Sequence, residues 1–111
     1  MSASPDQRAR FTAGLRELAD YLDAHDDVPV PDYPHITVHA DGASDAGDRQ
    51  AVDAAARGLG TRAAESRPGS GHYKTRRDFG PLSYEVLAIS RACMADYDAR
   101  QSYAGNVITA A

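Results

Sequence analysis

The sequence predicts an α+β fold in which one strand and a β-hairpin form a three-stranded, largely antiparallel sheet packed by about three helices. Two strand-like runs meet at Gly80-Pro81, and apolar residues near the N-terminus recur at helical spacing. Helical and strand-like segments alternate along 111 residues, a length typical of one domain. We therefore expect a single small domain over residues 1–111, with loose termini at 1–4 and 106–111.

The first helix is expected from Pro5 to Ala24 or His25. Ser4 is a favourable N-cap, Pro5 occupies the first helical position, and Gln7 stands where a capping box has Glu or Gln. Four large apolar residues then recur at i, i+4, i+7 and i+11, which places them on one helix face. They are Phe11, Leu15, Leu18 and Leu22. We expect this face to provide core and interface contacts.

A proline-rich connector and a short strand come next. Residues 26–34, DDVPVPDYP, contain three prolines, each of which disfavours helical geometry in the residue before it. The following segment, residues 35–40 or HITVHA, places Ile36 and Val38 on one face and polar residues on the other, the pattern of a strand.

A second helix is expected from Ser44 or Asp45 to about Gly58. Its apolar stripe consists of Val52, Ala55, Ala56 and Leu59. The Gly58-Leu59-Gly60 segment lacks the third glycine of a dinucleotide-binding loop and follows a helix instead of opening one, so it is interpreted as a helix terminator. Residues 61–71 are expected to form a mobile loop.

The segment His72–Ile89, HYKTRRDF-GP-LSYEVLAI, predicts the hairpin and its register. On one face, the two-residue loop pairs Phe79 with Leu82, Arg77 with Tyr84, Thr75 with Val86 and Tyr73 with Ala88. On the other face, it pairs Asp78 with Ser83, Arg76 with Glu85, Lys74 with Leu87 and His72 with Ile89. One face is therefore aromatic and aliphatic, and the other carries an opposite-charge pair. A third helix is expected from a Ser90 cap to about Ser102.

Composition predicts a small core. Leu, Val, Ile and Phe together make up 17 of the 111 residues, below the roughly 20% at which a composition begins to suggest disorder. A net charge of only −4 and the clear periodic segments argue against a disordered chain. Since a domain of this size has little core to spare, we expect self-association, most simply a homodimer.

Candidate metal and catalytic groups are weakly supported. His35 and His39 would share a strand face about 13 Å apart, too far to bind one ion. Asp41, Asp45 and Asp48 lack the order of a calcium-binding loop and are explained by helix capping. No cofactor-binding or catalytic motif is found, so we expect a non-enzymatic protein with no metal, although a small enzyme or metal protein stays an alternative.

Cys93 is the only cysteine, which excludes an intramolecular disulfide. It falls on the apolar side of the third helix without an identifiable histidine partner, and it is expected to be buried and inert. No apolar run approaches the ~18 residues of a membrane span, and the polar N-terminus does not resemble a signal peptide. A cytoplasmic location without membrane contact is the expectation.

Charge is distributed unevenly, with 5 Arg against 11 acids in residues 1–60 and 7 Lys+Arg against 5 acids in residues 61–111. The first hairpin strand concentrates the basic residues, and aromatic side chains on a sheet can stack on bases while arginines bind phosphates. The candidate surface for single-stranded nucleic acid or for a protein partner consists of Tyr73, Lys74, Arg76, Arg77 and Tyr84. There are two alternatives to a binding surface: the acidic half of the chain is simply solvated, and the hairpin is used for core or interface. The negative net charge favours these alternatives over nucleic-acid binding.

Two long segments, FTAGLRELADYLDAHDDVPVP and FGPLSYEVLAI, followed by SYAGNV, resemble a family of small actinobacterial and actinophage proteins of unknown function. The resemblance implies a cytoplasmic protein of an actinobacterium, its phages or its mobile elements, and it transfers no catalytic residue. The leading hypothesis is thus a self-associating module that binds a further, unidentified protein. Nucleic-acid binding through residues 72–77 is the alternative.

Overall fold

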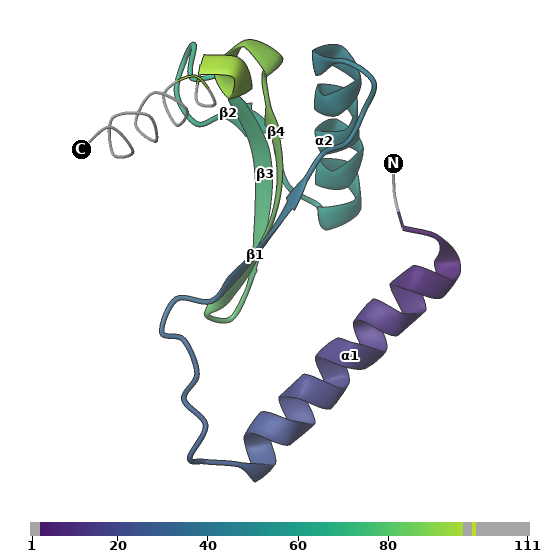
Figure 1. Ribbon diagram of the computed structural model, residues 1–111, viewed down its shortest axis with the longest axis vertical. Coiled ribbons are helices and arrows are strands. Elements are labelled where there is room, and N and C mark those ends of the chain that lie inside the picture. Colours follow the sequence, from purple (N-terminus) through teal and green to yellow (C-terminus); the bar gives the residue numbers. More distant parts are fainter. Residues whose placement is uncertain (1–2, 97–98, 100–111) are drawn as a thin grey trace, which may run out of the picture. The chain divides into compact units, whose positions relative to one another are not determined.

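The computed structural model describes residues 3–96 and residue 99. The chain divides into two compact units, Met1–Pro34 and His35–Ala111, and each is described by itself (Figure 1). The predicted loose terminus at 106–111 and the predicted end of the third helix lie outside the described residues.

The first unit consists of helix α1, Pro5–Ala24, and the connector that follows it. The predicted capping box is confirmed, because the Ser4 hydroxyl accepts a hydrogen bond from the Gln7 backbone N–H at 3.1 Å and the Gln7 side chain accepts one from the Ser4 N–H at 2.9 Å. At the other end, Nδ1 of His25 lies 2.8 Å from the Tyr21 carbonyl oxygen. Residues 26–34 form neither helix nor strand, as their prolines predict.

The second unit contains a four-stranded mixed sheet in the order β1-β4-β3-β2. Its strands are β1 (His35–His39), β2 (Ala64–Glu65), β3 (His72–Phe79) and β4 (Leu82–Ile89). The prediction of an α+β fold is confirmed, but the sheet has four strands where three were predicted, and one of its three pairings is parallel. β1 pairs with β4 in parallel, since the chain returns through a helix before it reaches the hairpin.

The fourth strand, β2, lies inside the segment 61–71 that was predicted to be a loop. Ala64 pairs with Lys74 and Glu65 with Tyr73, which extends the sheet beyond β3. By contrast, the hairpin register is confirmed at all eight predicted pairs, from His72 opposite Ile89 to Phe79 opposite Leu82.

Helix α2, Asp45–Leu59, covers one face of the sheet over β3 and β4 (Figure 1). Ser44 caps its first turn by accepting the Gly47 N–H at 3.0 Å, and Gly60 ends it in the left-handed region at φ 71°. The predicted start of the helix is confirmed, and its end lies one residue beyond the predicted Gly58. Of the predicted inner stripe, Ala55 and Leu59 are half-buried. Val52 is fully buried, and Ala56 packs beside it on the same side.

A further helical segment begins at residue 91 and is described to residue 96. The Ser90 hydroxyl accepts the Cys93 N–H at 3.2 Å, so the predicted cap is confirmed. The described core is small, as composition predicted. Its buried side chains are Val52, Ala56 and Ala88 together with Asp48 and Thr75.

Candidate functional site

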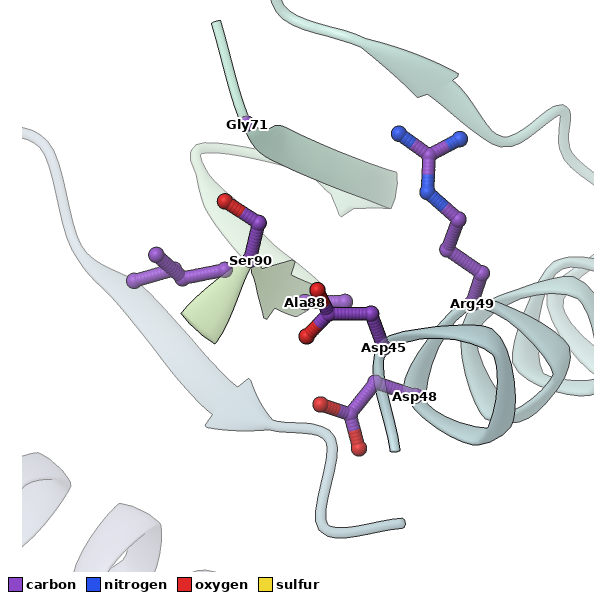
Figure 2. Close-up of a pocket in the computed structure, with 7 residues that line it drawn as sticks. Asp45, Asp48, Arg49, Gly71, Ala88 and Ser90 are labelled. Atoms are coloured by element: carbon purple, nitrogen blue, oxygen red, sulfur yellow. The ribbon is translucent and has the colours of Figure 1, made fainter. Parts of the chain in front are cut away.

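A polar network centred on Arg91 lies where α2 begins, and Figure 2 shows two of its residues, Asp45 and Asp48. The Arg91 backbone N–H and Nη1 both donate to Oδ1 of Asp45, at 3.0 and 2.9 Å. Nη1 also donates to Oδ2 of Asp48 at 3.1 Å, and Nη2 donates to the Gly42 carbonyl oxygen at 3.1 Å. Asp48 in turn accepts the Gly42 N–H at 2.5 Å. One guanidinium therefore joins the loop after β1, the start of α2 and the segment after β4.

The two carboxylates of this network differ in burial. The Asp48 side chain is 9% exposed, whereas that of Asp45 is 49% exposed. The side-chain hydrogen bond from Arg91, together with the backbone one, holds the pKa of Asp45 below its ordinary value. The hydrogen bond to Asp45 correspondingly raises the pKa of Arg91, so the pair is ionised at neutral pH.

A cavity of about 170 Å³ lies beside this network. It is lined by Asp45, Asp48, Arg49, Gly71, Ala88, Ile89 and Ser90 (Figure 2). Both carboxylates already accept hydrogen bonds from Arg91, and the Arg49 guanidinium forms an ion pair with Glu65. The charged groups of the cavity are thus engaged in structural contacts, and the arrangement serves to hold elements together.

A second polar cluster connects α2 with β2 and β3. The Arg49 guanidinium lies 4.5 Å from the centre of the Tyr73 ring and pairs with Glu65. The Tyr73 hydroxyl donates to Asp53, and this hydrogen bond raises the pKa of Tyr73. The pKa of Glu65 is lowered, chiefly by the hydrogen bond from Arg49. The candidate residue Tyr73 is therefore part of the packing between α2 and the sheet.

The remaining residues of the predicted hairpin surface are divided between the two faces of the sheet. Arg77 and Tyr84 share the α2 side with Tyr73, whereas Lys74 and Arg76 point to the other side, as strand alternation requires. The structure therefore does not bring the five predicted residues onto one surface.

The cations among them are also paired. Lys74 lies 3.4 Å from Glu85, and Arg76 lies 3.3 Å from Asp78. Arg77 donates to the Leu59 carbonyl oxygen at 2.9 Å, at the end of α2. The predicted register of Arg76 opposite Glu85 is confirmed, but the ion pair of Glu85 is with the diagonal neighbour Lys74.

Cys93 differs from its prediction, because it is half-buried and has a histidine neighbour. Its Sγ lies 3.6 Å from Nε2 of His72. The predicted hairpin register pairs His72 with Ile89, which lies four residues before Cys93. The sequence therefore already indicated that His72 and Cys93 could be neighbours. One thiol and one imidazole supply two of the four ligands of a structural zinc site. Within residues 3–96, no group of three or more metal-ligating side chains occurs, and His35 and His39 lie exposed along β1.

The first unit carries one amphipathic helix, α1, whose large apolar residues lie on one face. We call Phe11, Leu15, Leu18 and Leu22 the α1 seam. Phe11 is 48% exposed, Leu15 38% and Leu18 54%, and no residue of α1 is buried. The described part of the first unit contains no second helix or strand to pack on the seam, and its contribution to a core stays a prediction.

Comparison of the chain with protein-family models, with curated proteins and with solved structures found no match. Among the described helices, none is both long and apolar enough to cross a membrane.

Proposed function

We propose that this protein is a non-enzymatic, self-associating interaction module whose contact surface is the α1 seam. With no matching protein to guide the proposal, it rests on one observation. Helix α1 has 20 residues and an apolar face, and the described part of its own unit contains no other helix or strand to cover that face.

Such a helix gains from a partner for two reasons. Helical stability in proteins comes mostly from packing of the apolar face and less from the helix propensity of the residues. A contiguous exposed apolar patch also marks protein interaction sites more often than a solvated surface. The α1 seam meets both conditions, since its residues are contiguous on one face.

The expected affinity is modest. Burying an exposed Leu or Phe fully contributes about 1.5–3 kcal/mol, so half-exposed side chains contribute about 1 kcal/mol each. Two seams supply eight side chains, and the cost of association offsets a large part of their sum of about 8 kcal/mol. We therefore expect association that is no tighter than the micromolar range.

Sedimentation equilibrium between about 1 and about 100 μM tests the proposal, because these concentrations bracket a micromolar dissociation constant. Leu15→Gln with Leu18→Gln should abolish association. Ala9→Gln with Ala13→Gln, on the opposite face of α1, is the matched control and should leave it unchanged. A monomer at every concentration would refute self-association.

The nucleic-acid alternative has less support. Its five residues lie on two faces of the sheet, and its cations are paired with Glu85, Asp78 and the end of α2. It stays a prediction, as do the cytoplasmic location and the actinobacterial or phage origin. Salt-sensitive binding of a labelled single strand that is lost in Arg76→Ala with Arg77→Ala would support nucleic-acid binding.

A further inference from the structure

We draw no further inference here: the strongest candidate, the Cys93–His72 pair where β3 begins beside the helical segment that starts at residue 91, consists of one thiol and one imidazole, and nothing among the described residues completes a metal site around it or shows what it would bind.

Discussion

The residue with the widest structural role is Arg91, whose guanidinium contacts Asp45, Asp48 and the Gly42 backbone. Of these, Asp48 is the buried partner, and it also satisfies the Gly42 N–H. A buried acceptor contributes more than an exposed one, because its loss leaves donors unsatisfied where water cannot replace it. The network therefore depends more on Asp48 than on Asp45.

We expect Asp48→Ala to lower the free energy of unfolding by about 1–3 kcal/mol, because it leaves the Gly42 N–H and part of the Arg91 guanidinium without an acceptor. Asp45→Ala is the matched variant and should cost less than about 1 kcal/mol, the range of exposed ion pairs. Urea unfolding of both variants measures the difference. Equal losses would contradict the assigned order of burial.

The lowered pKa values of Asp45 and Glu65 predict acid sensitivity. A group whose pKa is lowered by folding contributes stability above its ordinary pKa, and that stability is lost as the pH falls through the lowered value. The free energy of unfolding should therefore fall as the pH drops below about 4. Arg91→Gln should flatten part of this dependence, and parallel pH curves for the variant and the wild type would refute the coupling of Arg91 to Asp45.

The contribution of Tyr73 to the free energy of unfolding should change with pH in the opposite direction. The hydrogen bond to Asp53 raises its pKa, so its contribution is present below the ordinary value of 10.0 and is lost as the pH rises through the raised value. Asp53→Ala should lower the pKa of Tyr73. Arg49→Ala should raise it, because the nearby guanidinium favours the ionised phenol. NMR titration of the Tyr73 ring distinguishes the two directions, and shifts of the same sign would refute the assignment.

At the scale of elements, local sequence signals were enough to predict α1, α2 and the hairpin. The Gly80-Pro81 loop length and the two-residue alternation define one register, and a slip by a single residue would place Thr75 and Ala88 on the opposite face. The caps Ser4 and Ser44 likewise lie in the residues beside their own helices. These contacts span few residues, so the sequence alone predicts them.

The elements that sequence reasoning missed depend on distant contacts. β2 has only two residues, too few for a periodic signal, and it becomes a strand because β3 offers it a free edge. The parallel pairing of β1 depends on β4, which follows far along the chain. The Arg91 network is missed for the same reason, since Arg91 and Asp45 are separated by 46 positions.

Two glycines near the end of α2 should respond oppositely to the same substitution. Gly60 has φ 71°, so Gly60→Ala should destabilise by about 1–2 kcal/mol. Gly58 lies inside α2 with open space around its Cβ position, and Gly58→Ala should stabilise by about 0.4–1 kcal/mol. Thermal unfolding of the pair measures both. Destabilisation by Gly58→Ala would contradict the helix boundary.

At the scale of the whole molecule, the sheet unit has a small described core, and the unit that contains α1 has no second described helix or strand to cover the α1 seam. The composition predicted the small core, and the described residues bury only three apolar side chains below the surface. It did not predict that α1 belongs to a unit apart from the sheet, because amphipathic periodicity indicates which face is buried but not what buries it.

Self-association should therefore couple the stability of α1 to concentration. Since binding stabilises the folded form by mass action, the melting temperature of α1 should rise with protein concentration. Circular dichroism at two concentrations measures this. The control is Leu15→Gln with Leu18→Gln, in which the dependence should vanish. A melting temperature that does not depend on concentration in the wild type would argue against the dimer.

The parallel pairing of β1 with β4 has a consequence for synthesis of the chain on the ribosome. β1 emerges first, but its partner emerges last among the strands, and at 5–20 residues per second the wait is about 3–10 s. During this interval Ile36 and Val38 have no neighbouring strand, and an unpaired edge is open to intermolecular pairing. Chains truncated before Leu82 would stay in that state, so premature termination should yield aggregation-prone fragments.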